Sequence, residues 1–221
     1  MSDHSIIHRV NSISRVITVK NARPRGRPLS FNRDIALQKA AERFWSHGYE
    51  GTSITDLTSA MGITPQSLYT AFRSKAGLYQ EALDWYADTF GNTGLEALEG
   101  PGAVKTLSAW LLSQARAFAS SSYPKGCMIS VAALGCATEN STVARMASQK
   151  REATIALLQR RLTRAISEGE LDKSADPDAL ARFIGAILQG MTVQARDGAS
   201  EAQLVAIAKL ATDSLHQALR A

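Results

Sequence analysis

The sequence predicts an all-α protein, and three observations carry that prediction. Apolar side chains recur at three- and four-residue spacing in one segment after another, which is the period of a helix with one buried face. Capping residues, prolines and glycines bound most of these segments as helix start and stop signals. The alternation typical of strands is scarce. With 221 residues, 45% of them hydrophobic, the chain can bury a substantial core.

The first predicted helix covers residues 33–47, where apolar side chains return at helical spacing. Asn32 or Ser30 can act as its N-cap, because either side chain can accept a hydrogen bond from an unpaired backbone N–H. Gly48 is the predicted stop, since glycine adopts the left-handed backbone that ends many helices. This segment would therefore form one amphipathic helix.

Two shorter helices are predicted next. Ser53 and Asp56 form a capping box, with aspartate in place of the usual glutamate, and Gly62 ends the helix that they begin. Thr64 then caps a helix of about two turns. Pro65 occupies the first position of that helix, where the missing N–H costs nothing and the fixed φ is already helical. The proline is a start signal.

The rest of the chain reads as a succession of longer helices. Ser74 caps the first of them, and a break rich in glycine follows at 91–102. Asp176-Pro177 and the Ser200–Gln203 capping box start the last two. The predicted helices lie at about 75–90, 103–120, 127–137, 142–168, 177–198 and 201–219.

The second and third helices, joined by a turn at Gly62, have the spacing of a helix-turn-helix. The second helix of such a pair places its N-terminal residues on base edges in the DNA major groove. Five apolar side chains are expected to pack inward and hold the pair together: Ile54, Leu57, Met61, Leu68 and Phe72. Four polar side chains are expected to face outward: Gln66, Ser67, Tyr69 and Thr70.

These outward residue types suit DNA. Gln66 can bond an adenine edge through two hydrogen bonds, Ser67 and Thr70 adapt to several bases, and the Thr70 methyl suits thymine. Tyr69 and Lys75 suit phosphates, because a hydroxyl and a point charge fix register without reading sequence. The expected DNA contacts in this region are Ser53, Thr64, Gln66, Ser67, Tyr69, Thr70 and Lys75.

Residues 30–83 resemble the DNA-binding domain of the TetR/AcrR family of bacterial transcriptional regulators. The resemblance rests on A-x-x-x-F-W-x-x-G-Y-x-G-T-S at 40–53, followed by I-T-D-L-T-S-A-M-G-I-T-P-Q-S-L-Y-T-A-F-R-S-K at 54–75. Gln66 stands where many members carry glycine, and Thr70 where many carry histidine or an aromatic residue. The operator sequence therefore does not follow from the resemblance.

The excess positive charge lies at the N-terminus. Residues 1–33 hold seven Arg or Lys residues against the single acid Asp3, whereas the net charge of the whole chain is +5. Arg25 and Arg27 stand in an R-G-R-P stretch just before the first helix, where family members often carry a similar element. Such a segment can follow a narrow minor groove; a flexible basic tail that touches only phosphates is the alternative.

The resemblance implies three parts: a basic arm at 1–28, a helix-turn-helix domain at 29–76, and a helical ligand-binding and dimerisation domain at 77–221. Homodimerisation is expected through the last two helices. A stripe of Leu204, Ile207, Ala211 and Leu215 fits that role, with Ala181 and Gly185 permitting close approach; ordinary intramolecular core is the alternative. A dimer would read a pseudo-palindromic operator.

The resemblance further implies a small-molecule effector that releases a repressor from its operator. Aromatic, sulfur-containing and polar residues on the middle helices would suit a mainly apolar ligand, although plain core is the alternative for each. The candidate ligand-binding residues are Trp110, Phe118, Cys127, Met128, Met146, Phe183 and Gln189.

Several other classes of protein are disfavoured. Ser122-Tyr-Pro-Lys125 matches S-x-x-K, but the companion motifs of that hydrolase class are absent. The four histidines form no catalytic or metal-binding constellation, and no glycine-rich phosphate loop occurs, so we expect neither enzyme activity nor a metal or cofactor. No membrane span or signal peptide is evident, and a cytoplasmic protein is expected.

A thiol-based sensor of oxidants or electrophiles is the second functional hypothesis. Cys127 and Cys136 would lie on opposite faces of the predicted 127–137 helix, too far apart for a disulfide. Cys127 would begin that helix beside Lys125, where the helix dipole favours a thiolate. The alternative is that both cysteines are small buried hydrophobes.

Overall fold

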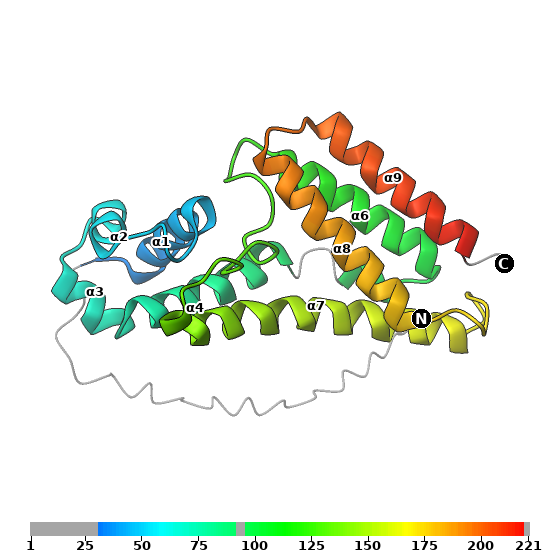
Figure 1. The fold of residues 1–221 in the computed structure, drawn as a ribbon, viewed down its shortest axis with the longest axis horizontal. Helices are drawn as coiled ribbons and strands as arrows, with labels where there is room; N and C mark the ends of the chain where they lie inside the picture. The colour runs from blue at the N-terminus through cyan, green and yellow to red at the C-terminus, as the bar shows by residue number, and fades with distance from the viewer. Residues whose placement is uncertain (1–30, 92–95, 219–221) are drawn as a thin grey trace, which may run out of the picture.

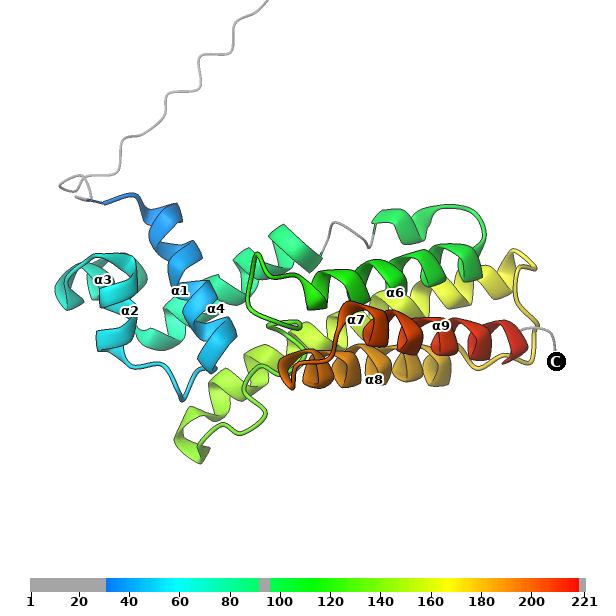
Figure 2. The ribbon, with the colours of Figure 1, turned by 90° about the horizontal axis from the view of Figure 1, so that it is seen from above.

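The structure is a computed structural model that describes residues 31–91 and 96–218. Every regular element in these two ranges is helical, which confirms the predicted all-α fold (Figure 1). α1, α2 and α3 gather at one end of the molecule, and α6, α8 and α9 form the body at the other. The long helix α7 runs under this body and toward α4 (Figures 1 and 2). The N-terminal arm, with Arg25 and Arg27, lies outside the described residues.

The helices follow one another along the chain in nine α- or π-helical elements and two short 3₁₀ turns within the described ranges. Their bounds are α1 Arg33–His47, α2 Ile54–Met61, α3 Pro65–Phe72, α4 Lys75–Tyr86, π-helix η1 Ala87–Gly91, 3₁₀ turn η2 Glu96–Glu99, α6 Ala103–Ala119, 3₁₀ turn η3 Thr138–Asn140, α7 Ser141–Ser167, α8 Pro177–Arg196 and α9 Glu201–Ala218.

The predicted helix starts are confirmed at the level of single hydrogen bonds. Asn32, rather than Ser30, caps α1 by accepting from the N–H groups of Asp34 and Ile35. The Ser53–Asp56 capping box is complete at α2. Thr64 accepts from the Ser67 N–H at α3, with proline at its first position. Each cap satisfies N–H groups that the helix itself leaves unpaired.

A first hydrophobic core joins α1–α4 to part of the segment that follows α6. Phe44, Tyr49 and Tyr79 form its aromatic centre, with Tyr79 edge-on to Phe44 at a centroid distance of 4.9 Å. Met128 and Val143, from the α6–α7 connection and α7, are buried in the same cluster. The end formed by α1–α3 is therefore packed against the body rather than tethered to it.

The second core lies between α6, α7, α8 and α9. An ion pair between a buried and a partly exposed side chain closes its far end: Arg161 on α7 is bonded to Glu170 at 2.9 Å, with the Arg161 side chain 1% and the Glu170 side chain 25% exposed. Glu170 also accepts from the N–H groups of Gly102 and Ala103 at 2.8 and 2.7 Å. Because these bonds favour the charged carboxylate, they lower the pKa of Glu170 to about 2. Glu170 thus caps α6 from a distant part of the chain.

The predicted helix at 127–137 is wrong. This segment is a series of turns, and Ala133 has a positive φ of 53°. Met128, Ser130 and Ala132 are buried, whereas the residues between them are more exposed. Burial therefore repeats every second residue, which is not the period of a helix. Without this helix, Cys127 has no helix N-terminus beside it. No helix among the described residues is long and apolar enough to cross a membrane.

Candidate DNA interface and effector cavity

The α2–α3 pair is held by apolar side chains below the predicted DNA-reading face. Leu57 and Leu68 are fully buried, and Phe72 is 2% exposed. Gly62 ends α2 in the left-handed conformation, with a φ of 68°, so that α3 can start in a new direction. This packing stabilises an eight-residue helix that would be marginal alone.

The opposite face of α3 is open to solvent. Gln66 and Thr70 are exposed and Ser67 is half-buried, while Tyr69 is 46% exposed. The Thr70 hydroxyl donates to the Gln66 carbonyl at 2.8 Å, which leaves its methyl group as the part most available to a base. α3 therefore presents an amide, a phenol and a methyl group on one surface.

Ser53, Thr64 and Ser67 have their hydroxyls engaged within the domain. The Ser53 hydroxyl donates to the Asp56 carboxylate at 2.6 Å, and the Thr64 and Ser67 hydroxyls lie 3.0 Å apart. These groups shape the two helix starts, and Ser53 and Thr64 remain exposed. A contact with DNA by any of them would add to a capping role.

Lys75 differs from the expected free surface cation. Its ammonium lies 4.2 Å from the centre of the Tyr49 ring, which is the geometry of a cation–π contact. Burial lowers the pKa of Lys75, while the nearby Glu50 carboxylate opposes that shift. Lys75 is thus partly committed to the fold at the start of α4.

Arg33, one of the seven basic residues of the 1–33 segment, belongs to the folded domain and not to the basic arm. Its guanidinium is bonded to Glu81 at 2.7 Å, donates to the Ala71 carbonyl and covers the Phe72 ring at 4.4 Å. It ties α1 to α3 and α4, so its charge is neutralised within the domain.

Arg73 is a candidate DNA contact that the motif analysis missed. It is exposed directly after α3, where a guanidinium suits a phosphate. Its backbone φ is 67°, a conformation that L-residues other than asparagine and aspartate rarely adopt. The sequence showed only an arginine directly after the predicted helix, and the unusual backbone at this position is visible only in the structure.

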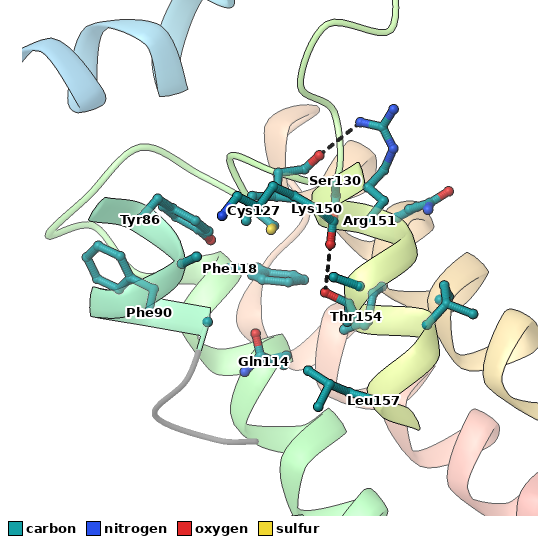
Figure 3. A pocket seen from close by; sticks show the side chains of 18 of the residues that line it. Tyr86, Phe90, Gln114, Phe118, Cys127, Ser130, Lys150, Arg151, Thr154 and Leu157 are labelled. Atoms are coloured by element: carbon teal, nitrogen blue, oxygen red, sulfur yellow. Dashed lines mark hydrogen bonds between the residues drawn. The ribbon is translucent and has the colours of Figure 1, made fainter. Parts of the chain in front are cut away.

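A cavity of about 270 Å³, here called the central cavity, lies among α4, η1, α6, α7 and α8 (Figure 3). Its apolar and aromatic wall comprises Tyr86, Ala87, Phe90, Gly91, Trp110, Phe118, Cys127, Ile129, Ala153, Ile155, Leu157, Gly185 and Leu188, and its polar lining comprises Asp88, Gln114, Ser130, Lys150, Arg151, Thr154 and Gln189.

Four of the seven predicted ligand-binding residues line this cavity: Trp110, Phe118, Cys127 and Gln189. The structure places the other three elsewhere. Met128 is buried in the first core and Met146 packs against it, whereas Phe183 is 37% exposed on α8. Helical spacing alone could not distinguish these faces.

Sequence reasoning missed the parts of the wall that come from α4, η1 and α7. Tyr86 and Phe90 approach the cavity from the end of α4 and its π-helical extension (Figure 3). A signal did exist for Gln114, because Trp110, Gln114 and Phe118 recur every four residues and so share one face of α6.

The positive charges at this cavity are already satisfied. Lys150 is paired with Asp84 at 2.5 Å. Arg151 donates to the carbonyl oxygens of Ile129 and Ala132, and its guanidinium points away from the cavity (Figure 3). Since these cations have internal partners, the lining suits an uncharged ligand better than an anion.

Two contacts connect the body to the C-terminal end of α1. Arg196, in the last turn of α8, donates to the carbonyl oxygens of Ser46 at 2.8 Å and Trp45 at 3.4 Å. The Trp45 ring stacks on Tyr123 from the α6–α7 connection, with centroids 6.0 Å apart. Both contacts fix α1 relative to helices of the body.

The stripe predicted for dimerisation is mostly intramolecular core. Leu204, Ala211 and Leu215 are 0–3% exposed within the second core, because α9 packs them against α6. Ala181 is also buried, and a Cβ at Gly185 would lie 2.2 Å from Ile155 of α7. These small residues allow close approach between α7 and α8.

A different face of α8 is apolar and exposed. Its members recur at four- and three-residue spacing, the pattern of a helix that packs on another helix. They are Ala179, Phe183, Ala186, Gly190 and Val193 on α8, accompanied by Ala206 and Leu210 on α9.

A packed helix-turn-helix with an open polar face, joined to a helical body that holds a cavity, defines a class of DNA-binding regulators. Residues 36–82 match the family model described as bacterial regulatory proteins, tetR family. Residues 90–209 match the tetracyclin repressor-like C-terminal domain. The chain belongs to the TetR family of transcriptional regulators.

Three relatives cover most of the chain. The HTH-type transcriptional repressor ComR of Escherichia coli is 35% identical over 83% of this chain and 89% of its own length. BdcR, another repressor of that bacterium, is 28% identical over 90% and 97%. A structure of a CifR cysteine mutant with a 26-base-pair operator duplex superposes with a TM-score of 0.82, at 38% identity, covering 85% of this chain and 98% of CifR.

Proposed function

We propose that the protein is a homodimeric repressor that binds a pseudo-palindromic operator and is released by a small, mainly apolar effector. The exposed polar face of α3 carries the DNA-binding part: Gln66, Tyr69 and Thr70 stand on a helix whose other side is fully packed. The repressors among its relatives, and the operator complex of CifR, support this assignment.

The dimer would form through the exposed stripe on α8 and α9. A second copy of this chain is the proposed occupant, because an apolar helical face can pack against its own copy about a two-fold axis and the small residues Ala186 and Gly190 would let two helices approach closely. Two copies would then place two α3 helices in successive major grooves.

The effector would occupy the central cavity. A ligand bound more tightly by a form of the dimer with unsuitable spacing of its α3 helices would shift the population away from the DNA-competent form. The aromatic wall and the internally paired cations of the cavity favour an uncharged molecule.

The test of the DNA assignment is operator selection from a random duplex pool, followed by titration at several salt concentrations. We expect a palindromic site and a steep loss of affinity with salt, with a log–log slope of about −0.9 per neutralised phosphate. Deleting residues 1–28 should weaken binding and flatten the slope while leaving the dimer intact. Salt-insensitive binding would contradict the proposal, and an unchanged slope in the truncated chain would remove the arm from it.

Thiol sensing is the second candidate function, because Cys127 lies in the wall of the central cavity, partly exposed. An electrophile that entered the cavity would meet this sulfur. Cys136 provides an internal comparison, since burial and the Glu50 carboxylate raise the pKa of its thiol. Mass spectrometry after brief exposure to N-ethylmaleimide would detect a Cys127 adduct; an unmodified Cys127 in the native protein would eliminate this function.

A further inference from the structure

A second cavity, of about 470 Å³, lies between α1 of the DNA-binding end and the body, and is here called the interdomain cavity. Its lining residues are Trp45, Tyr86, Phe90, Ser113, Gln114, Ala117, Phe118, Ser120, Ser122, Tyr123 and Gly126. Four of these residues also line the central cavity: Tyr86, Phe90, Gln114 and Phe118. The two cavities are therefore neighbours that share a wall of side chains.

Figure 3 shows this shared wall from the central cavity, with Tyr86 and Phe90 together on one side and Gln114 at the surface of α6. Phe90 and Gln114 are only half-buried. Rotation of such side chains about their rotatable bonds is fast compared with movement of the helices that carry them. Movement of these two side chains would let a ligand extend from one cavity into the other without unfolding a helix.

The lining of the interdomain cavity is free of formal charge. Five of its lining residues are aromatic, and its polar side chains carry hydroxyl or amide groups. An isolated ion would lose its hydration there without gaining a counter-charge. The cavity therefore selects for an uncharged, largely aromatic or aliphatic group.

Trp45 lines this cavity and carries one polar group that is covered by its neighbours and has no partner in the part of the chain that the structure describes. The residue is 5% exposed, and its indole N–H is buried without a hydrogen-bond acceptor among the described residues. The rings of Tyr86, Phe90 and Tyr123 surround it at centroid distances of 4.7, 5.4 and 6.0 Å. Ring faces are weak acceptors, so a carbonyl or ether oxygen would be a better partner for this donor.

We propose that the interdomain cavity is a subsite for the effector, and that it binds an uncharged apolar group carrying a hydrogen-bond acceptor for the Trp45 indole N–H. The effector is then an elongated neutral molecule, with one end in the central cavity and an oxygen-bearing end against α1. This inference rests on the proposed effector-released repressor and specifies the ligand class and the point of contact.

The position of the subsite gives the ligand a direct effect on the DNA-binding end. Trp45 belongs to α1, whereas Tyr123 and Phe118 belong to the body. A group inserted among these rings must change how Trp45 stacks on Tyr123. Because that stacking helps to fix α1 on the body, the ligand binds best to a form in which the two ends are differently oriented.

The experiment compares two neutral probes of the same shape, 4-acetylbiphenyl and 4-ethylbiphenyl, by calorimetric titration of the full-length protein. Only the first carries a carbonyl oxygen. We expect the ketone to bind about three- to tenfold more tightly, the factor given by one hydrogen bond of typical net strength. We also expect the ketone to release the selected operator at a lower concentration than the hydrocarbon.

Three variants locate the oxygen. Trp45→Phe removes the N–H but keeps a ring, and should reduce the preference for the ketone to a factor near one. Trp85→Phe, a matched change on α4 outside the cavity lining, should keep it. Ala117→Phe, which fills the interdomain cavity from an exposed position on α6, should weaken both probes at least tenfold. Operator binding without probe reports whether each variant is folded.

Each outcome decides the proposal. A fourth variant tests the competing donor, because Trp110 lines the central cavity and its indole N–H is likewise buried without an acceptor among the described residues. If Trp110→Phe rather than Trp45→Phe abolishes the preference, the ketone lies in the central cavity and the interdomain subsite is wrong. Tight binding of both probes to Ala117→Phe also contradicts it. If neither probe binds the wild-type protein, the ligand class is wrong. Failure of the probe-free protein to bind any operator would instead reject the proposed function itself.

Discussion

Gln66 lies in the first turn of α3 with its amide exposed, and no part of the domain packs over it. Gln66→Ala should cost about 1–3 kcal/mol on the selected operator, because a two-bond contact with a base edge is lost. The base preference should relax at one position in each half-site. Binding to single-base mismatches measures both effects. Uniform loss on every sequence would show that Gln66 positions the protein without reading a base.

The role of a residue could be predicted from the sequence where its interaction partner lies only a few residues away in the chain. The caps at Asn32, Ser53 and Thr64 follow from residue type and spacing, because their partners lie two or three residues away. Lys75 was not predictable in this way, since its partner Tyr49 is brought close by the packing of α1 against α4. Local bonds are readable from sequence, and contacts made by tertiary folding are not.

At the scale of elements, local signals were sufficient to predict the α2–α3 unit, whereas the 127–137 segment depends on tertiary contacts. Residues 127–134 are almost uniformly apolar, so their sequence contains neither a helical nor a strand period to distinguish. Gly126 has a φ of 75°, and a Cβ added at this position would lie 2.7 Å from the Thr192 side chain of α8. Contact with α8 thus sets the path of this segment, and only the folded body provides that contact.

The oligomeric state of a variant tests whether the exposed stripe on α8 is the dimer interface. Val193 is 47% exposed in the single chain, so Val193→Asp should fold normally but place two carboxylates in the proposed dimer interface. We expect a monomer by sedimentation equilibrium and a loss of cooperative operator binding. Lys105→Asp, which introduces a carboxylate at an exposed position of α6 outside the stripe, should leave the dimer intact. A dimeric Val193→Asp protein would show that the stripe is not the interface.

At the scale of the whole molecule, Glu170 controls stability in acid. Its pKa in the folded protein, about 2, lies below the ordinary value of 4.5. Stability from this group is therefore fully present above about pH 4.5 and is lost as the pH falls toward 2. Glu170→Ala should lower the free energy of unfolding by about 1.5–3 kcal/mol at neutral pH, because Arg161 loses its carboxylate partner and keeps only the carbonyl acceptors of Leu98 and Gly100.

Urea unfolding of Glu170→Ala at pH 7 and pH 3 measures this contribution. The variant should lose less stability than the wild type over that interval. Glu168→Ala is the control, since that carboxylate is 50% exposed and pairs with Arg164 only at 3.6 Å. A loss in the Glu168 variant as large as in the Glu170 variant would assign the effect to general surface charge.

Arg196 links the proposed dimer helix to the DNA-binding end. Arg196→Ala removes the donors to the last carbonyl groups of α1, where a cation is also favoured by the helix dipole. We expect operator affinity to fall about tenfold and the protein to tolerate a wider range of half-site separations. Titration of operators with altered spacers measures this tolerance. Unchanged spacer discrimination would show that Arg196 does not orient α1.

The positive φ at Arg73 means that stability and operator affinity favour different residues at this position. Glycine adopts a positive φ without strain, so Arg73→Gly should raise the free energy of unfolding by about 1 kcal/mol. The same change removes an exposed guanidinium beside α3, and operator affinity should fall with a flatter salt dependence. Thermal melting and operator titration of this variant measure both. Laboratory selection for a more heat-resistant protein would therefore favour glycine at this position, and the selected variants would bind the operator less tightly.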